Sequence, residues 1–254
     1  MDRELASDSI AGFVRAHLDR AALTSTEPLV RSVDILSRHW DAWLTAGGHP
    51  GSASYVGPLE PPRVAAAADA RKGLTPRDPL RRGADLETDR AHLLALSARA
   101  ANSNERRCVA LWVATMMWGS GTLNGRGPWR TAQGLAFDGL GALLTQSHRR
   151  LRANDVAEAY RIAATIPGSA ESSFTKWLWA ASLGLDDPAP QPLVLDGRVR
   201  ATLASIGVRP SHNATGYVDY VETMALAAAE LRSADRLRGA TPEKLEWLLS
   251  VRAP

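Results

Sequence analysis

The sequence predicts an all-α protein, and three observations support this fold class. Apolar residues recur at intervals of three and four along nearly the whole chain, which is the spacing of a helix with one buried face. No alternating run of apolar and polar residues is long enough to predict a strand. No segment recurs at a fixed period, so an array of repeats is not expected.

The first half of the chain is expected to contain helices separated by two irregular loops. Gly47 and Gly48 end the second stripe of apolar residues, which begins at Leu29 and reaches Leu44. Prolines and glycines make residues 49–62 and 75–85 irregular. The sequence CVALWVATMM is apolar on all sides and predicts a buried central helix. The expected helices in this half lie at residues 10–18, 29–44, 87–101 and 105–118.

The second half begins with a sharp break, because residues 118–131 (WGSGTLNGRGPWRT) interrupt the helical pattern. Asn154 is expected to cap the helix that follows it. A proline-rich linker at residues 188–192 leads to Asp196, which stands at the start of a short helix. The expected helices lie at residues 131–146, 154–165, 173–183, 197–206, 216–238 and 241–251.

Length and composition indicate an ordinary globular protein. The 254 residues are 45% hydrophobic and 22% charged, a balance that allows a buried core and excludes wholesale disorder. No apolar run approaches the ~20 residues of a membrane span, and residues 1–8 lack a signal-peptide pattern. The single cysteine, Cys108, excludes an intramolecular disulfide and a Cys-rich zinc site. We therefore expect a cytoplasmic monomer that folds as one helical unit over residues 1–254.

Lysine is scarce in this chain, so the position of each lysine is informative. Thirty basic residues include only Lys72, Lys176 and Lys244 as lysines, and the net charge of +3 is too small for a histone-like nucleic-acid binder. Lys176 stands in the apolar segment SSFTKWLWAASL, where desolvation would lower its pKa and make the neutral amine available as a nucleophile. Asp196 follows twenty residues later, at a helix start where backbone N–H groups could orient its carboxylate.

A lysine and a carboxylate together have the chemistry that excision of a nucleobase requires. Breaking an N-glycosidic bond develops positive charge on the sugar, which a carboxylate stabilises while an amine or a water attacks C1′. Each residue also has a simpler interpretation: Lys176 could extend over apolar surface with its amine in water, and Asp196 could be only a helix cap. The scarcity of lysine favours the catalytic interpretation, and capping is compatible with it.

Residues 153–206 resemble the helix-hairpin-helix DNA glycosylases, and most closely their bacterial 8-oxoguanine glycosylase group. The resemblance rests on a helix, a Pro-Gly turn, a second helix with FTK, and then PLVLDGRV. The stretch WGSGTLNGRGPWRT is similar to a W-G-x-G…G-P-x-R stretch of the same group. The resemblance implies two helical lobes with a cleft between them and Lys176 and Asp196 as the catalytic pair. Residues 1–118 would then be mainly N-terminal helices and residues 213–254 the C-terminal helices.

Two departures from the family pattern bear on the site. The hairpin usually reads L-P-G-V-G with the lysine shortly after it, whereas here IPG at residues 166–168 is followed by SAESSF, so the turn is longer or shifted. Ala180 stands four residues after Lys176, where the well-known eukaryotic enzymes carry a cysteine that helps to sandwich the oxidised guanine. A smaller residue in that wall leaves room for a bulkier base.

The resemblance also implies contacts with duplex DNA, whose modified nucleotide the protein would extrude. The chemistry needs no cofactor, although hairpins of this superfamily bind phosphate, sometimes with a monovalent cation. The histidines lack the spacing of a metal site, so none is expected. The candidate DNA-binding residues are Arg126, Arg130, Arg149, Arg150, Gly168, Ser169 and Arg198, and the candidates for the base pocket are Trp118, Ala180, Tyr217 and Tyr220.

Some of these candidates have an equally simple structural role. Arg149 and Arg150 could form a solvated helix end. Tyr217 and Tyr220 could pack in the core, and residues 118–131 could be a plain connection between helices.

The sequence therefore predicts a DNA glycosylase. If the amine of Lys176 attacks C1′ after Asp196 has removed its proton, a Schiff base and strand nicking follow, whereas attack by water leaves an abasic site alone. Ala180 and the family context favour a bulky modified cytosine of phage DNA, glucosylated 5-hydroxymethylcytosine excised in antiviral defence, over 8-oxoguanine repair. Two other classes stay open, a non-catalytic helix-hairpin-helix module that binds DNA and a helical bundle that binds proteins.

Overall fold

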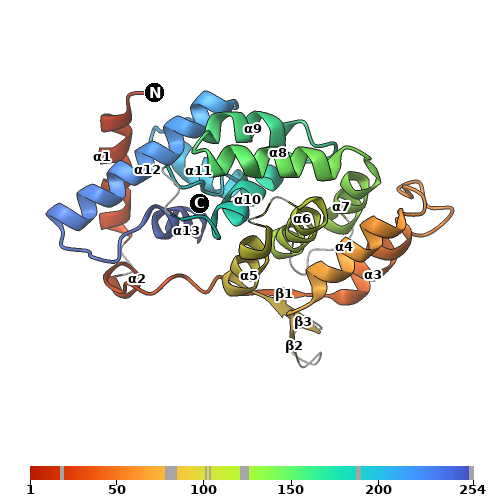
Figure 1. Ribbon diagram of the computed structural model, residues 1–254. Coiled ribbons are helices and arrows are strands. Elements are labelled where there is room, and N and C mark those ends of the chain that lie inside the picture. Colours follow the sequence, from red (N-terminus) through yellow and green to blue (C-terminus); the bar gives the residue numbers. More distant parts are fainter. Residues whose placement is uncertain are drawn as a thin grey trace.

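The computed structural model describes residues 1–17, 20–77, 85–100, 102, 104–120, 126–186 and 190–251. These residues form thirteen helices and one three-stranded sheet, which confirms the all-α class with a small β addition (Figure 1). The helices are α1 (Arg3–Ala16), α2 (Arg20–Thr24), α3 (Ser37–Ala46), α4 (Pro61–Arg71), α5 (Arg90–Ala100), α6 (Glu105–Ser120), α7 (Arg126–Ala136), α8 (Leu140–Arg152), α9 (Val156–Ala164), α10 (Glu171–Ser182), α11 (Gly197–Ser205), α12 (Ala214–Ala234) and α13 (Pro242–Val251). None of the helices in this described part is long and apolar enough to cross a membrane.

The sheet is a feature that the sequence does not predict, because its strands are too short to show an alternating pattern. Its strand order is β1-β3-β2, and both pairings are antiparallel. The guanidinium of Arg77 binds carboxylates from two of the strands, Asp34 at 2.9 Å and Glu87 at 2.6 Å. The strands are β1 (Val33–Ile35), β2 (Thr75–Pro76) and β3 (Leu86–Thr88).

Several helix boundaries differ from the prediction. The helix expected at residues 29–44 begins only at Ser37, because residues 33–35 form β1, and the helix expected at residues 10–18 begins already at Arg3. The helix expected at residues 131–146 is two helices, α7 and α8, because the chain turns at residues 137–139. The irregular stretch predicted at residues 118–131 is helical at both ends, and residues 121–125 lie outside the described residues. Asp155 caps α9 in place of Asn154, which has a left-handed φ of 55° and belongs to the preceding turn.

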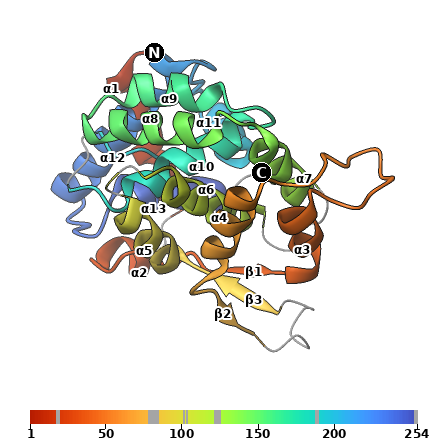
Figure 2. The same cartoon turned by 45° about the vertical axis from the view of Figure 1, so that its right-hand side comes forward.

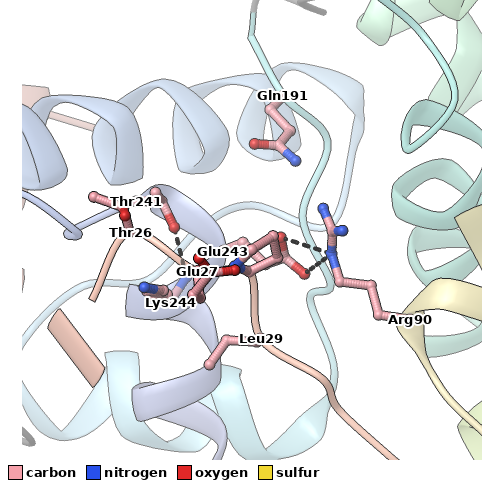
Figure 3. A pocket seen from close by; sticks show the side chains of 9 residues that line it. Thr26, Glu27, Leu29, Arg90, Gln191, Thr241, Glu243 and Lys244 are labelled. Carbon is pink, nitrogen blue, oxygen red and sulfur yellow. Dashed lines mark hydrogen bonds and ion pairs between the residues drawn. The ribbon is translucent and has the colours of Figure 1, made fainter. Parts of the chain in front are cut away.

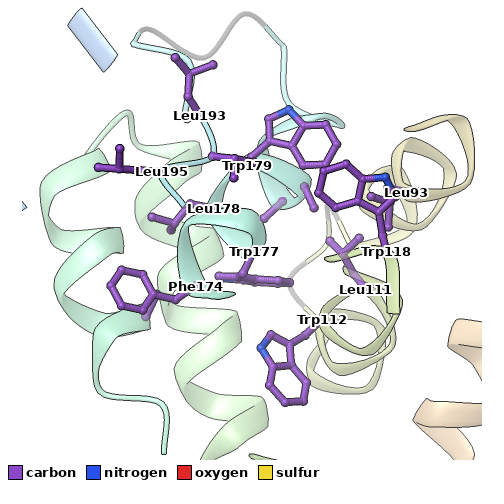
Figure 4. Packing of buried hydrophobic residues seen from close by; sticks show 14 of the residues in the cluster. Leu93, Leu111, Trp112, Trp118, Phe174, Trp177, Leu178, Trp179, Leu193 and Leu195 are labelled. Atoms are coloured by element: carbon purple, nitrogen blue, oxygen red, sulfur yellow. The ribbon is translucent and has the colours of Figure 1, made fainter. Parts of the chain in front are cut away.

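Helices α6 and α10 occupy the centre of the array, which confirms the buried central helix expected from CVALWVATMM. Helices α1, α12 and α13 lie on one side of the molecule and α3 and α4 on the other (Figures 1 and 2). Between them, α10 packs against α5, α6, α8 and α9. Trp177 and Trp179 of α10 are fully buried and lie near Trp112 and Trp118 of α6, respectively (Figure 4). This packing holds the helix that carries Lys176 against the last turns of α6.

A segment without regular secondary structure, residues 25–32, connects α2 to β1, and we call it the strap. The amine of Lys244 on α13 holds its beginning by a hydrogen bond to the carbonyl of Ser25, and it donates a second bond, at 2.9 Å, to the carbonyl of Ala22 in α2. Near its end, the carbonyl of Val30 accepts a hydrogen bond from the N–H of Arg90, at 3.0 Å. The strap thus brings N-terminal residues to the junction of α5, α6 and α13.

Candidate active site

Lys176 lies near the middle of α10 with its side chain half-buried. Its Nζ donates a hydrogen bond to the backbone carbonyl of Gly119, at 3.4 Å. Gly119 leaves room for the lysine, because a Cβ at that position would come within 2.8 Å of the Cδ of Lys176. The last turn of α6 therefore accommodates the lysine stem and holds its amine.

Asp196 lies at the N-terminus of α11 and caps that helix, which confirms the expected capping role. Its Oδ1 accepts hydrogen bonds from the backbone N–H groups of Arg198 and Val199, at 3.0 and 3.1 Å. Both bonds go to one carboxylate oxygen, so capping also fixes the orientation of Oδ2.

The chain before Asp196 is held in an extended form by two tyrosines of α12. The hydroxyl of Tyr217 accepts a hydrogen bond from the N–H of Leu193, at 3.1 Å, and donates one to its carbonyl, at 2.7 Å. The hydroxyl of Tyr220 donates to the carbonyl of Val194, at 3.0 Å. Both tyrosines are 0% exposed, so neither ring can stack on an extruded base in this conformation. Their role is the simpler one, core packing that positions the segment leading to Asp196.

A buried hydrogen bond connects the residues that precede the two candidate catalytic groups. The N–H of Leu195 donates to Oγ1 of Thr175, at 3.1 Å. That hydroxyl in turn donates to the carbonyl of Glu171, at 2.8 Å. Both Thr175 and Leu195 are buried. Lys176 and Asp196 therefore extend from backbone that is fixed in relative position.

The amine of Lys176 lies in surroundings that favour its neutral form. Burial lowers the pKa of Lys176 below its ordinary value and is the largest influence on it. The carboxylates of Asp196 and Glu246 oppose this shift, whereas the guanidinium groups of Arg31 and Arg198 add to it. The lowered pKa agrees with the prediction made from the apolar sequence around the lysine.

Two of these charged groups, Arg31 and Glu246, form a buried ion pair that no sequence pattern had indicated. Nη1 of Arg31 lies 2.6 Å from Oε2 of Glu246, and the two side chains are 9% and 0% exposed. Burial raises the pKa of Glu246, and Arg31 opposes that shift. Glu246 interrupts the apolar sequence LEWLL of α13, a signal that could have identified it, whereas the strap around Arg31 has no periodicity.

Trp118 lies beside this ion pair, next to Gly119 in the chain. Its ring centroid is 4.7 Å from that of Trp179, and the Cζ of Arg31 lies 4.9 Å from the Trp118 ring and 5.1 Å from the Trp179 ring. The indole N–H of Trp118 donates to the carbonyl of Arg31, at 2.8 Å. Of the candidates for the base pocket, Trp118 therefore adjoins the lysine. Ala180 is fully buried and lines no opening among the described residues.

The hairpin between α9 and α10 spans residues 165–170. Gly168 has a φ of 72°, in the left-handed region that favours glycine. The N–H of Ser169 binds the carbonyl three residues earlier, at 3.1 Å. The carbonyl of Arg130 lies 3.7 Å from the position that a Cβ on Gly168 would take, so α7 packs against the hairpin. Helix α10 begins at Glu171 without a side-chain cap, which leaves backbone N–H groups at the hairpin, a geometry suited to phosphate.

The candidate DNA-binding arginines lie in separate places. Arg126 and Arg130 are exposed, one turn apart on α7, and Arg198 is exposed at the start of α11. Arg149 and Arg150 are exposed at the end of α8, and the nine residues of α9, roughly 13 Å of helix, separate them from the hairpin. The structure thus places the backbone of Arg130 against the hairpin, with Arg126 one turn away on α7, and leaves the α8 pair at the opposite end of α9.

Glu171, in the first turn of α10, holds three helices together. Its carboxylate accepts hydrogen bonds from the hydroxyl of Tyr160 on α9, at 2.7 Å, and from two guanidinium N–H groups of Arg200 on α11, each at 2.8 Å. The Nδ1 of His212 lies 3.0 Å from the same carboxylate. The end of the hairpin and the helix capped by Asp196 are therefore connected as one unit.

A small cavity of about 180 Å³ lies beside the strap, one helical turn along α13 from Glu246 (Figure 3). Glu27 of the strap and Gln191 of the linker are among its lining residues. Arg90 and Glu243 form an ion pair in its wall, at 3.0 Å. Among the described residues, no group of three or more His, Cys, Asp or Glu side chains is placed to hold a metal ion.

The model of one protein family matches most of the chain, including the candidate catalytic residues. The model of the family described as "Putative 8-oxoguanine DNA glycosylase OGG-like protein" matches residues 57–250. The searches of curated proteins and of solved structures gave no match. The matched region contains Lys176, Asp196 and Glu246, whereas Arg31 precedes it.

Proposed function

Because the chain belongs to the family of OGG-like 8-oxoguanine DNA glycosylases, we propose that it excises a modified base from duplex DNA with Lys176 and Asp196 as its catalytic pair. The position of the Lys176 amine carries this proposal. The amine is held on the carbonyl of Gly119, burial lowers its pKa, and Asp196 is the charged group that acts on it most strongly.

The reaction follows from these two groups. Asp196 accepts a proton from the ammonium of Lys176, and the neutral amine attacks C1′ of the extruded nucleotide. The N-glycosidic bond breaks, its electron pair leaves with the base, and the base takes up a proton. Asp196 supplies that proton, and the carboxylate that this leaves stabilises the positive charge on the sugar. The attached amine then loses a proton, its electron pair forms the C1′=N bond as the C1′–O4′ bond opens, and O4′ takes up a proton. The resulting Schiff base either hydrolyses or loses a C2′ proton and eliminates the 3′ phosphate.

DNA binding is proposed for the face that contains the hairpin. Gly168 and the uncapped first turn of α10 would offer backbone N–H groups to a phosphate beside Ser169, whose own N–H binds the carbonyl of Ile166, with Arg126, Arg130 and Arg198 around them. Trp118 would line the base pocket. We propose a monomer that needs no cofactor for its chemistry, with a monovalent cation at the hairpin as an accessory to phosphate binding.

Two substrates are proposed, in an order that the structure and the family together suggest. The family description makes 8-oxoguanine the first substrate to test. Glucosylated 5-hydroxymethylcytosine of phage DNA is the second, because the argument for a bulkier base rested on Ala180, and that residue is fully buried. Excision of the first would be DNA repair, and excision of the second would be defence against phage.

The test is mass spectrometry of the bases released from two DNAs, an 8-oxoguanine duplex and phage DNA with glucosylated hydroxymethylcytosine. We expect one base to be released by the wild type and neither by Asp196→Asn. Borohydride should trap a covalent adduct of wild type but not of Lys176→Gln, which would separate attack by the amine from attack by water.

Release of neither base by a folded wild type would contradict both proposed substrates. If that protein also bound DNA with an affinity that Lys176→Gln left unchanged, the non-catalytic DNA-binding module would be the better interpretation. Absence of any salt-dependent DNA affinity would favour the protein-binding bundle.

A further inference from the structure

A short chain of contacts connects the buried ion pair to the amine of Lys176. Glu246 binds the guanidinium of Arg31, which lies over the ring of Trp118. The indole N–H of Trp118 returns to the backbone carbonyl of Arg31, so this arginine contacts the tryptophan through both its side chain and its backbone. The next residue, Gly119, accepts the hydrogen bond from Lys176. The strap therefore supports the turn of α6 that holds the amine.

The backbone of Arg31 adds a second observation. Its φ of 49° lies in the left-handed region, which a residue other than glycine adopts infrequently. Such strain persists only where surrounding contacts enforce it, and it clusters at functional sites. Here the ion pair with Glu246 and the two tryptophan rings hold the guanidinium in place. Packing thus holds Arg31 in a backbone conformation that residues other than glycine disfavour.

We propose that Arg31 and Glu246 are positioning residues of the excision reaction. Their opposed charges, together with the contacts of Arg31 with Trp118, set the protonation state and the position of Lys176. This inference rests on the proposed function and extends it to two residues that come from the opposite ends of the chain. Neither residue needs to touch the substrate. They act through the lysine and through the turn of α6 beneath it.

The charges around the lysine show how the pair would act. On the amine, Glu246 and Asp196 favour the ammonium form, whereas Arg31 and Arg198 favour the neutral form. Other titratable groups lie on the elements packed against α10 or beside the pair. They include Arg90 of α5 and Glu243 of α13, which bind each other, His148 of α8, and Tyr160 of α9, which binds Glu171 of α10 itself.

Opposite effects are therefore expected from the two members of the pair. Loss of the Glu246 charge leaves Arg31 uncompensated beside the lysine and should favour the neutral amine. Loss of the Arg31 charge removes the group that lowers the pKa of Glu246, so at pH values where this carboxyl is still ionised its uncompensated charge should favour the ammonium. A role limited to packing would not produce opposite effects on the lysine, because either variant would only loosen the same contacts.

The scarcity of lysine allows a direct test. Labelling with [13C]lysine gives signals from only Lys72, Lys176 and Lys244, and the signal that disappears in Lys176→Arg belongs to the site. Titration of that signal in the free, full-length protein measures the pKa of Lys176. We expect Glu246→Gln to lower this pKa and Arg31→Gln to raise it, each by about one unit, and the double variant to restore it.

The matched control is the neighbouring ion pair. Arg90 and Glu243 join α5 to the same helix, α13, one turn before Glu246. Glu243→Gln should therefore shift the pKa of Lys176 much less than Glu246→Gln.

The pH dependence of single-turnover excision gives a second measurement. The acidic limb of the profile of rate against pH should move to lower pH in Glu246→Gln and to higher pH in Arg31→Gln.

The proposal is overturned if the two single variants leave the pKa of Lys176 unchanged or shift it in the same direction. Should they fail to fold, Glu246→Asp carries the test, because it withdraws the carboxylate by one methylene group. It should lower the pKa by a smaller amount, and an unchanged pKa would again overturn the proposal. Since the titration needs no substrate, failure of this inference is distinguishable from failure of base release by the wild type.

Discussion

The N–H of Leu195 donates a hydrogen bond to the hydroxyl of Thr175, at 3.1 Å, and so joins the residue before Asp196 to the residue before Lys176. The backbone that carries the carboxylate is thus fixed relative to the backbone that carries the amine. The two groups therefore start from fixed positions and do not depend on free motion of the chain to meet. Preorganisation of this kind is what a transition state with developing charge requires.

The first prediction concerns this hydrogen bond. Thr175→Val keeps the shape of the side chain but leaves the buried N–H of Leu195 without its acceptor, which should lower the free energy of unfolding by about 1–3 kcal/mol. Excision should slow as well, because Asp196 loses its fixed position. Thr175→Ser keeps the hydroxyl and is the control. Denaturant unfolding and single-turnover excision would measure both effects, and equal behaviour of the two variants would contradict the prediction.

The second prediction concerns the room that Gly119 leaves for the lysine. A Cβ at this position would come within 2.8 Å of the Cδ of Lys176, so Gly119→Ala should displace the amine and slow excision by about 10- to 100-fold. Stability should change little, because alanine favours a helix over glycine. The control is Gly12→Ala in α1, where nothing lies within 4 Å of the added Cβ. An excision rate within twofold of wild type in Gly119→Ala would contradict the close approach.

The third prediction concerns the stability of the protein in acid. Burial lowers the pKa of His148 to about 4, with a contribution from Arg152. The unfolded chain then binds the proton more readily than the folded one between pH 6.5 and 4, so stability is lost as the pH falls through this range. From pH 7 to pH 5 the loss from this residue should be about 2 kcal/mol.

Denaturant unfolding of the wild type and of His148→Gln at the two pH values would measure this loss. The variant should start from a lower stability at pH 7 but depend less on pH. Equal pH dependence in the two proteins would show that His148 is not responsible.

The fourth prediction separates the two groups of arginines. If the DNA-binding face contains the hairpin, Arg130→Ala should weaken DNA binding and reduce the slope of log affinity against log salt by about one. Arg149→Ala should change that slope less, because it lies beyond the far end of α9. Binding would be measured in an Asp196→Asn background so that the substrate stays intact. A larger effect of Arg149→Ala would place the DNA on the other end of this helix pair.

Sequence patterns anticipated the features that depend on near neighbours in the chain. The helical content, the buried helix α6, and the capping role of Asp196 follow from residues within a few positions of one another. The same local reasoning could not decide between the two interpretations of Tyr217 and Tyr220. Their hydroxyls bind the backbone of Leu193 and Val194, a contact between separate elements that no spacing within α12 reveals.

What the sequence by itself determined is which residues can form helices and which side chains have the chemistry of base excision. What only the tertiary structure decided is the set of charges around Lys176. Arg31 and Glu246 are 215 residues apart, so no spacing between neighbouring residues predicts that they form an ion pair. The physical reason is that a helix or a cap forms through contacts within about four residues. The partner of a buried charge, by contrast, depends on which distant segments exclude water together.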